Sequence, residues 1–251
     1  MNRLLYRVVF NKARGMLMVA AEIARACSGG SASSGIVHTL CRLVCRLRTL
    51  SFSLWLAIGA VHTAQAAIVA DKSVPGKQQP TVLVTANGTP QINIQTPSAG
   101  GVSRNTYSQF DVDKKGVILN NARRNTSTQL GGMVSANPWM AKGEAKIILN
   151  EVNARTPSRL NGYIEVAGQK AQVVIASPAG ITCNGCGFIN AGRATLTTGT
   201  AQLQNGNLTG YQVDRGEVVI EGKGLDASRQ DYTDIIARAV KVNAAINAKE
   251  L

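Results

Sequence analysis

After residue 67 the chain is a succession of short runs rich in Val, Ile and Thr, each bounded by Gly, Asn or Pro. Such runs are typical of β-strands, and the residues between them favour turns. The runs are TVLVTA (81–86), QINIQ (91–95), GVILNN (116–121), AKIILNEV (145–152), GYIEVAG (162–168), AQVVIAS (171–177), ATLTTG (194–199) and EVVIEG (217–222). In segment 232–251 the apolar residues have helix-like spacing, and periodicity alone leaves that segment undecided. The pattern predicts one all-β domain over residues 67–251.

Three features favour a β-solenoid over the alternatives, a sandwich or a barrel. Runs such as VVIA and EVVI are apolar without clean alternation, as expected of parallel strands that neighbouring coils bury. Asparagines recur at the ends of the runs, where stacked side-chain amides could form ladders between coils (Asn120, Asn121, Asn150 and Asn190). Aromatic residues make up only 4% of the chain, too few to fill the thick core of a sandwich.

The N-terminal 66 residues have the three parts of a secretory signal peptide. Eight Lys or Arg residues against the single acid Glu22 form a basic region, residues 49–70 carry no charged side chain, and small residues follow at Ala64-Gln65-Ala66. We expect cleavage after Ala66, or one residue later, after Ala67. The alternative is an uncleaved membrane anchor, because 22 uncharged residues are long enough to span a bilayer.

Removal of residues 1–66 changes the charge from +13 for the whole chain to +6, from 19 basic and 13 acidic side chains. These charges are scattered, and no basic run with interleaved aromatic residues is present. Such runs are typical of nucleic-acid-binding surfaces, so we expect no nucleic-acid partner.

Two cysteines, Cys183 and Cys186, remain after cleavage, in an oxidising compartment. Cleavage would remove the other three cysteines and both histidines (Cys27, Cys41, Cys45, His38 and His62). A structural zinc site needs four Cys or His ligands, and a thioredoxin-like site needs a helix that the glycines around Cys186 disfavour. We therefore predict a local disulfide, whose short loop contributes only about 2 kcal/mol to stability.

Enzymatic activity has little support in residues 67–251. β-Helices that cleave polysaccharides need clustered carboxylates, often with calcium. Asp111 and Asp113 lie on one face of a strand, but an ordinary turn follows them and the other acids are dispersed. Without histidine no Ser-His-Asp or Cys-His arrangement is possible. We expect no catalysis, cofactor or metal, and a secreted carbohydrate-active or carbohydrate-binding β-helix is the alternative.

Five stretches carry a family resemblance: MNRLLYRVVFNKARGMLMVAAE (1–22), YSQFDVDKKGVILNN (107–121), SANPWMAKGEAKIILNEV (135–152), SRLNGYIEVAGQKAQVVIASPAGITCNGCGFINAGRATLTTG (158–199) and YTDIIARAVKVNAAINA (232–248). The first resembles the extended signal peptide region of the two-partner secretion exoproteins of Gram-negative bacteria. The others resemble their secretion domain. These exoproteins include filamentous haemagglutinins, haemolysins and contact-dependent inhibition toxins, and the paired cysteines resemble the branch that includes those toxins.

The resemblance implies an extended signal peptide over residues 1–66 and, over residues 67–251, a right-handed parallel β-helix with an N-terminal cap and a small extra-helical antiparallel sheet. It also implies strands in segment 232–251. The chain ends on an apparent coil without a polar capping element, so we expect the domain to be truncated at its C-terminal end.

The resemblance further implies a secretion and targeting module. The chain would enter the periplasm through the general inner-membrane secretion machinery. There the polypeptide-transport-associated domains of a cognate outer-membrane β-barrel transporter would recognise it, and the monomeric product would reach the cell surface or the medium. It would then nucleate the β-helix of an adhesin, haemagglutinin, haemolysin or toxin.

Two signature turns of the family fall on residues of this chain. The first, typically Asn-Pro-Asn-Leu, falls on Asn137-Pro138-Trp139-Met140, and the second, typically Asn-Pro-Asn-Gly-Ile, on Ser177-Pro178-Ala179-Gly180-Ile181. In such turns Pro fixes φ, Asn or Ser caps the turn through its side chain, and Gly supplies a positive φ. The resemblance implies that the transporter recognises these turns, with Asn150 and Glu151. The alternative is that they are structural turns that touch no partner.

Overall fold

The computed structural model describes residues 6–11, 16–21 and 67–251, in two separate compact units. In the first unit, β1 (Tyr6–Asn11) and β2 (Met16–Ala21) pair in antiparallel orientation. Most of the expected signal peptide, with Ala64 and Ala66, lies outside the described residues. No helix in the described part of the chain is long and apolar enough to cross a membrane.

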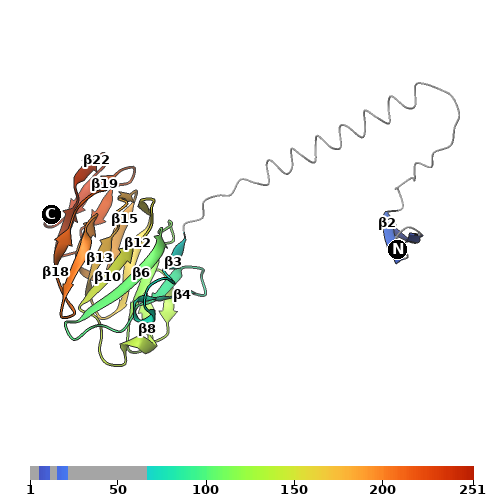
Figure 1. The fold of residues 1–251 in the computed structure, drawn as a ribbon, viewed down its shortest axis with the longest axis horizontal. Helices are drawn as coiled ribbons and strands as arrows, with labels where there is room; N and C mark the ends of the chain where they lie inside the picture. Colours follow the sequence, from blue (N-terminus) through green and yellow to red (C-terminus); the bar gives the residue numbers. More distant parts are fainter. Residues whose placement is uncertain (1–5, 12–15, 22–66) are drawn as a thin grey trace, which may run out of the picture. The chain divides into compact units, whose positions relative to one another are not determined.

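The second unit is a parallel β-helix built from three sheets (Figure 1). Sheet 1 contains β3 (Ile68–Ala70), β6 (Val102–Phe110), β10 (Ile147–Val152), β13 (Ala171–Ala176), β16 (Ala191–Thr197) and β21 (Tyr232–Ile236). Sheet 2 contains β4 (Thr81–Val84), β5 (Pro90–Asn93), β7 (Val117–Asn121), β12 (Tyr163–Gly168), β15 (Cys186–Ile189), β20 (Leu225–Ala227) and β23 (Ile246–Ala248). Sheet 3 contains β11 (Ser158–Leu160), β14 (Ile181–Cys183), β19 (Glu217–Ile220) and β22 (Ala239–Val242).

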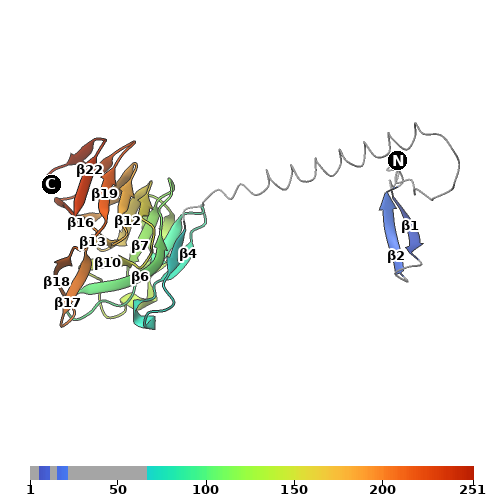
Figure 2. The same cartoon turned by 45° about the horizontal axis from the view of Figure 1, so that its top comes forward.

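Each complete coil passes through sheet 1, then sheet 3, then sheet 2, as β10, β11 and β12 do before β13, β14 and β15. The coils stack in sequence order, so the colours run from teal to red across the domain (Figure 2). Parallel register places Ile148 beside Val173 in sheet 1 and Ile164 beside Phe188 in sheet 2. All four side chains are buried in a core dominated by Val, Ile, Leu and Ala. The predicted parallel β-helix is confirmed.

The N-terminal end of the coil is covered by antiparallel strands. In sheet 1, β3 pairs with β6 and places Ile68 beside Phe110. In sheet 2, β4 pairs with β5, and a short 3₁₀ turn, η1 (Gly76–Gln78), lies between β3 and β4 in the chain. This arrangement is the predicted N-terminal cap, because antiparallel strands occupy the edges that further parallel coils would otherwise use.

At the opposite end, β21, β22 and β23 are the edge strands of sheets 1, 3 and 2. Segment 232–251 is therefore made of strands, as the family resemblance implies and against its helix-like spacing. The apolar residues recur at short intervals because the chain turns a corner of the coil between one strand and the next.

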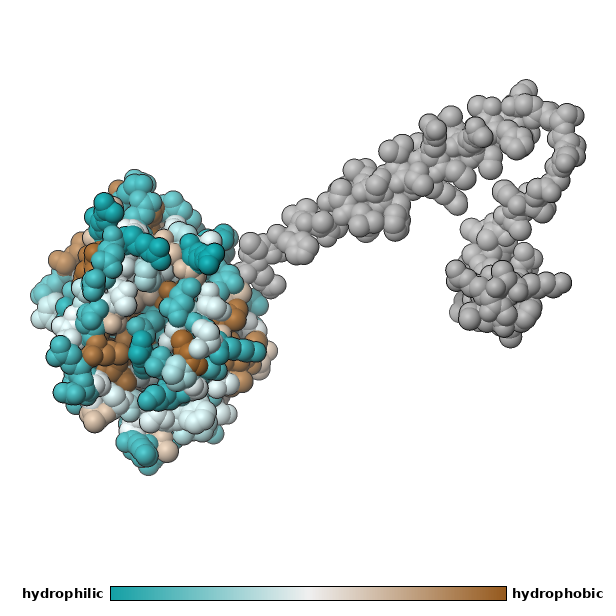
Figure 3. Space-filling model, in the orientation of Figure 1, coloured by the Kyte–Doolittle hydropathy of each residue, from teal (hydrophilic) through white to brown (hydrophobic). Residues whose placement is uncertain are grey.

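Two antiparallel hairpins extend from the coil. The pair β8 (Thr126–Thr128) and β9 (Gly132–Val134) follows β7, and Val134 packs with Ile118 on the outer face of sheet 2. The pair β17 (Thr200–Gln204) and β18 (Asn207–Gln212) follows β16 and covers the outer face of sheet 1. The face of the domain drawn in Figure 3 is mostly hydrophilic, with scattered apolar areas.

The asparagines at the ends of the runs connect coils mainly through main-chain carbonyls and less through amide ladders. Asn120 donates from Nδ2 to the side-chain oxygen of Asn93 at 2.9 Å, as a ladder requires. Asn121, Asn150 and Asn190 instead donate to main-chain carbonyls of neighbouring segments. These bonds satisfy the buried side chains of Asn120, Asn121 and Asn150, while Asn190 is exposed. All four asparagines link neighbouring segments of the coil.

Candidate functional site

The first signature turn begins at Asn137, a buried residue whose side chain makes three hydrogen bonds. Its Oδ1 accepts from the N–H of Trp139 at 3.0 Å and caps the 3₁₀ turn η2 (Pro138–Met140). Its Nδ2 donates to the carbonyls of Ile94 at 2.9 Å and Asn120 at 2.8 Å. These bonds connect the turn to the ends of β5 and β7, so Asn137 has a structural role whatever the turn recognises.

The last two residues of this turn face different surroundings. Met140 is fully buried and packs in the core. It occupies the position of the Leu in the family motif, and an apolar side chain suits this buried position. Trp139 is 43% exposed, and its carbonyl accepts from the hydroxyl of Thr96 at 2.9 Å. The indole is therefore the large side chain that this turn exposes to solvent.

The second signature turn lies at the corner between β13 and β14. The N–H of Gly180 donates to the carbonyl of Ser177 at 2.9 Å and closes the turn, and Gly180 has φ +121°. The Ser177 hydroxyl is buried and bonds to Ser158 Oγ, at 3.2 Å, in the preceding coil. Ser177 thus links two coils, whereas the main chain closes the turn.

The two signature turns lie at different corners of the coil. The second turn exposes part of Pro178 and Ala179, while Ile181 is buried as the first residue of β14. The first turn instead precedes β10, where the chain returns to sheet 1 from sheet 2. None of the hydrogen bonds described for one turn involves a residue of the other. The two signature turns are therefore separate parts of the surface.

Asn150 and Glu151, expected beside the turns, lie within β10. Asn150 Oδ1 accepts from the Tyr107 hydroxyl at 3.0 Å, and its Nδ2 donates to the Val174 carbonyl at 3.1 Å. Burial raises the pKa of Tyr107 above its ordinary value, so this phenol stays a donor. Glu151 pairs with Arg104 and is largely buried. Both residues hold neighbouring strands together, and neither is a prominent surface group.

The cysteines lie at a corner of the coil. A disulfide joins Cys183, the last residue of β14, to Cys186, the first residue of β15. Gly185 between them has φ +79°, a conformation that favours glycine. Both cysteines are buried in the core, and Cys183 stacks between Leu160 and Ile220 of the adjacent coils. The disulfide is therefore part of the packed interior as well as a local crosslink.

The paired carboxylates of Asp111 and Asp113 are used by the fold. Asp111 accepts from the N–H of Arg159 and from the side-chain amide of Gln109, both at 2.8 Å. Asp113 accepts from the N–H of Lys115 at 2.8 Å within its own turn. Among the residues described, no group of three or more His, Cys, Asp or Glu side chains could hold a metal ion.

One buried acid, Glu165 on β12, was missed in the sequence. Its two carboxylate oxygens accept from the N–H groups of Gln129 and Leu130 at 2.7 and 2.8 Å. Glu165 is 4% exposed, and these bonds fasten the β8–β9 hairpin to sheet 2. A charged residue inside the run GYIEVAG was the available signal, but its partners lie 35 and 36 residues away.

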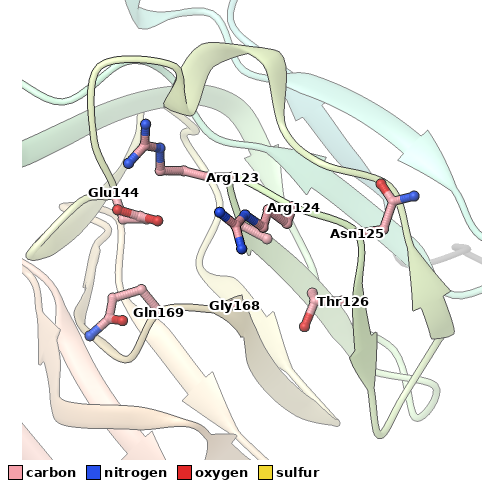
Figure 4. A pocket seen from close by; sticks show the side chains of 8 residues that line it. Arg123, Arg124, Asn125, Thr126, Glu144, Gly168 and Gln169 are labelled. Atoms are coloured by element: carbon pink, nitrogen blue, oxygen red, sulfur yellow. The ribbon is translucent and has the colours of Figure 1, made fainter.

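A second feature missed in the sequence is a hollow of 520 Å³ beside the first signature turn (Figure 4). Its lining residues come from the segment after β7, from the loop before β10 and from the turn after β12 (Ala122, Arg123, Arg124, Asn125, Thr126, Glu144, Gly168 and Gln169). The only hint of this hollow in the sequence was the adjacent pair of basic residues Arg123 and Arg124, which the sequence analysis did not single out.

Comparison with known proteins gives a consistent picture. The family model described as TPS secretion domain matches residues 66–251, and that described as the Extended Signal Peptide of Type V secretion system matches residues 1–51. "Toxin CdiA" of Yersinia pestis is 68% identical over 253 residues. "tRNA nuclease CdiA-2" of Burkholderia pseudomallei (strain 1026b) is 45% identical over 258 residues. Both alignments cover 100% of this chain, which spans about 8% of either relative.

Among solved structures, the crystal structure of the filamentous hemagglutinin secretion domain is similar, with a TM-score of 0.63 and 38% sequence identity. The similar region covers 69% of this chain and 56% of that chain.

Proposed function

We propose that this chain, which belongs to the family of TPS secretion domains, is recognised by the outer-membrane transporter of its own secretion pair. The chain is the TPS domain of a CdiA-type two-partner secretion exoprotein, with an extended signal peptide of type V secretion, and it is secreted or displayed on the cell surface of a Gram-negative bacterium. The observation that carries the proposal is the match of the whole β-helix to this family.

Toxin and nuclease activity is named for whole relatives, of which this chain spans about 8%. We place any such activity outside this segment, whose candidate carboxylates are hydrogen-bonded within the fold. The segment itself acts by being recognised, transported and folded.

The mature domain begins at Ala67 in this proposal, after cleavage behind Ala66. The carbonyl of Ala67 accepts from the N–H of Asp111 at 3.0 Å, and Ile68 is already paired with Phe110. Cleavage behind Ala67 would remove the first of these bonds. This geometry favours the earlier of the two expected cleavage positions.

The two signature turns are the proposed contacts of the transporter's polypeptide-transport-associated domains. The half-exposed Trp139 indole and the tip at Pro178 and Ala179 are the parts of the turns that a partner can reach. Asn137 and Ser177 support the turns from inside through buried hydrogen bonds. Asn150 and Glu151 act only indirectly, by holding β10 in register.

The monomeric domain also directs folding in this proposal, from its capped end outwards. No further strand pairs with β21, β22 or β23 in the described domain, although the Thr233 N–H of β21 donates to the carbonyl of Glu250 at 3.1 Å. This last coil exposes Tyr232, Val240 and Val242. A free strand edge has unpaired N–H and C=O groups that accept another strand. Further coils of the exoprotein would add there, as in other solenoids.

The test is secretion from cells with and without the cognate outer-membrane transporter. With the transporter, we expect protein in the medium or on the cell surface whose intact mass corresponds to a start at Ala67. Without it, the same protein should accumulate in the periplasm. Equal release in both strains, or retention of residue 1 in the inner membrane, would contradict the proposal.

A further inference from the structure

We propose that the bond between Cys183 and Cys186 is made in the periplasm, on the unfolded chain, by exchange with a protein that carries a reactive disulfide. This step rests on the function proposed above, in which the chain is recognised and transported before it folds. It gives the bond a place in the order of export: oxidation comes first, then transport, then folding.

Both cysteines are closed off from solvent in the folded domain. Cys183 is 0% exposed and Cys186 is 1% exposed. Cys183 lies in register between Leu160 of the preceding coil and Ile220 of the following coil, and Cys186 lies beside Leu225 of the following coil. Thiol–disulfide exchange requires that the attacking sulfur reach the disulfide of the oxidant. The oxidation therefore precedes the docking of the following coil.

A short segment of that following coil forms the cover. The N–H of Glu221 donates to the Cys183 carbonyl, and the N–H of Gly185 donates to the Gly224 carbonyl, both at 2.9 Å. The same Gly224 oxygen lies 3.2 Å from Cys183 Sγ. A Cβ on Gly185 would lie 3.2 Å from the Cβ of Lys223, so the segment runs directly against the loop between the cysteines. The corner is closed once this segment has folded over it.

The periplasm is the compartment in which the unfolded chain meets an oxidant. Domains dominated by strands fold in about milliseconds to seconds, whereas uncatalysed disulfide exchange takes about minutes to hours. Outside the cell, the following coil would therefore cover the thiols before an uncatalysed reaction could join them. In the bacterial periplasm, proteins with a reactive disulfide drive the oxidation of thiols. The chain passes this oxidant while its cysteines are still accessible.

The exchange takes place in two steps. The thiolate of one cysteine attacks the disulfide of the oxidant, forms a mixed disulfide and releases one thiolate of the oxidant. The thiolate of the other cysteine then attacks the chain's own sulfur in the mixed disulfide. This second attack forms the bond between Cys183 and Cys186 and releases the second thiolate of the oxidant. The chain loses two electrons and two protons, and the oxidant leaves as a dithiol.

The spacing of the pair suits oxidation of an unfolded chain. The two cysteines are three positions apart in the sequence, and their Cα atoms lie 5.3 Å apart, less than two Cα–Cα steps along the chain. Gly185 adopts its φ of +79° without the steric cost that a side chain would bring. The loop can thus close without help from neighbouring coils. It also adds little width to the chain, whereas a bond between distant residues would leave a wide loop to be transported.

The experiment follows the thiols of this chain in cells, by pulse labelling, acid quenching, alkylation and mass spectrometry. In cells without the cognate transporter, we expect the newly exported periplasmic chain to carry the bond between Cys183 and Cys186 already. Two free thiols in that periplasmic chain, with the bond present in the chain that complete cells secrete, would overturn the inference. Oxidation would then follow transport.

Cells that lack the periplasmic thiol oxidant provide the second measurement. We expect the chain that they secrete to keep both thiols. In the folded chain these thiols should react with an alkylating reagent at least about a hundredfold more slowly than in denaturant, because a buried group reacts only when the structure opens. A bond that forms in the medium, or equal reactivity of the folded and the unfolded chain, would contradict the inference. Retention of the reduced chain in the periplasm, while Cys183→Ala with Cys186→Ala is released, would support it, since transport would then require the bond.

Two controls separate this inference from the proposed function. Ser108→Cys in the chain with both alanines places a single thiol at an exposed position of β6, and it should react at nearly the same rate in the folded and the unfolded chain. The chain with both alanines also tests the role of the transporter without any thiol. If its release does not depend on the transporter, the proposed function fails. The order of oxidation is read separately, from the thiols of the newly exported chain.

Discussion

The Tyr163 hydroxyl donates a 2.8 Å hydrogen bond to the carboxylate of Asp226, two coils further along the β-helix. Gly187 of the intervening coil is in register with both residues. A Cβ on Gly187 would lie 2.5 Å from Tyr163 Cε1. The ring can cross the intervening coil only because this position has no side chain. The hydrogen bond to Asp226 raises the pKa of Tyr163. The pKa of Asp226 is lowered mainly by the hydrogen bond from the Ser228 hydroxyl, and to a smaller extent by the hydrogen bond from Tyr163.

The first prediction is that Gly187→Ala destabilises the domain by about 1–3 kcal/mol, the usual cost of overpacking. The new methyl group would displace the Tyr163 ring and break its bond to Asp226. Chemical denaturation of both proteins gives the difference in unfolding free energy. Gly210→Ala is the control, because nothing lies within 4 Å of a Cβ at that position in a strand. A loss at Gly210 as large as that at Gly187 would contradict the packing argument.

A second prediction concerns the stability of the N-terminal cap at acidic pH. The Ser73 hydroxyl, the Asn153 amide and the Ser73 N–H lower the pKa of Asp71. A carboxylate whose folded pKa is depressed stabilises the fold above its unfolded pKa of about 3.9, and that contribution disappears as the pH falls through the folded pKa. Asp71→Asn should therefore be less stable than the unmodified chain at pH 6, with the difference vanishing near pH 2.

Denaturation curves at several pH values between 2 and 7 test this prediction. Asp231→Asn is the comparison, because the Asp231 side chain is 58% exposed and its ion pair with Lys170 lies at the surface. Surface pairs contribute little, so its effect should be small at every pH. A pH-independent loss for Asp71→Asn would mean that the residue acts through packing alone.

The sequence predicted those parts of the fold in which strand pairing alone determines which residues are neighbours. Apolar runs such as VVIA identified strands buried between coils, and an oxidising compartment without histidine indicated the bond between Cys183 and Cys186. The β17–β18 hairpin could also have been predicted, since Asn205-Gly206 is a strong two-residue turn signal and both residues have positive φ. The β8–β9 hairpin could not, because its strands are only three residues long, and neither shows the alternation of a half-buried strand.

The roles of the candidate site residues were harder to predict than the strands. The side chains of Asn137 and Ser177 look like turn caps in the sequence, yet both also bond across to other segments. Glu165 and Asn121 depend on partners more than 20 residues away, and no local pattern specifies such contacts. Tertiary hydrogen bonds of this kind appear only when the coils are stacked.

The third prediction separates structure from recognition in the first signature turn. Asn137→Ala would leave the buried carbonyls of Ile94 and Asn120 without their donor, so we expect a loss of about 2–3 kcal/mol. Trp139→Ala removes a partly exposed side chain and should cost at most about 1 kcal/mol. Secretion by the transporter should nevertheless fall with Trp139→Ala. Unchanged secretion of a stably folded Trp139 variant would show that the turn is only structural.

A fourth prediction concerns the fastening of the β8–β9 hairpin. Glu165→Gln replaces one of the two carboxylate oxygens by an NH₂ group, which cannot accept a hydrogen bond. One of the two main-chain N–H groups, of Gln129 or Leu130, therefore loses its acceptor. The expected cost is about 1–3 kcal/mol. Amide hydrogen exchange should accelerate at residues 126–134 more than in the coil. Glu250→Gln, at an exposed position, is the control and should leave exchange in the hairpin unchanged.

The last prediction concerns the disulfide. A bond between residues three apart closes so short a loop that its entropic contribution is about 2 kcal/mol, and Cys183→Ala with Cys186→Ala should stay folded with a loss near that value. Both positions are fully buried among apolar residues, so serine at the same positions brings hydroxyl groups into the core. We expect the serine pair to be about 1–3 kcal/mol less stable than the alanine pair, the cost of a buried hydroxyl without a partner. Thiol labelling followed by mass spectrometry of secreted protein should find no free thiol at either cysteine. Two reactive thiols, or an alanine pair that fails to fold, would mean that the bond has a different role from the local crosslink at this corner.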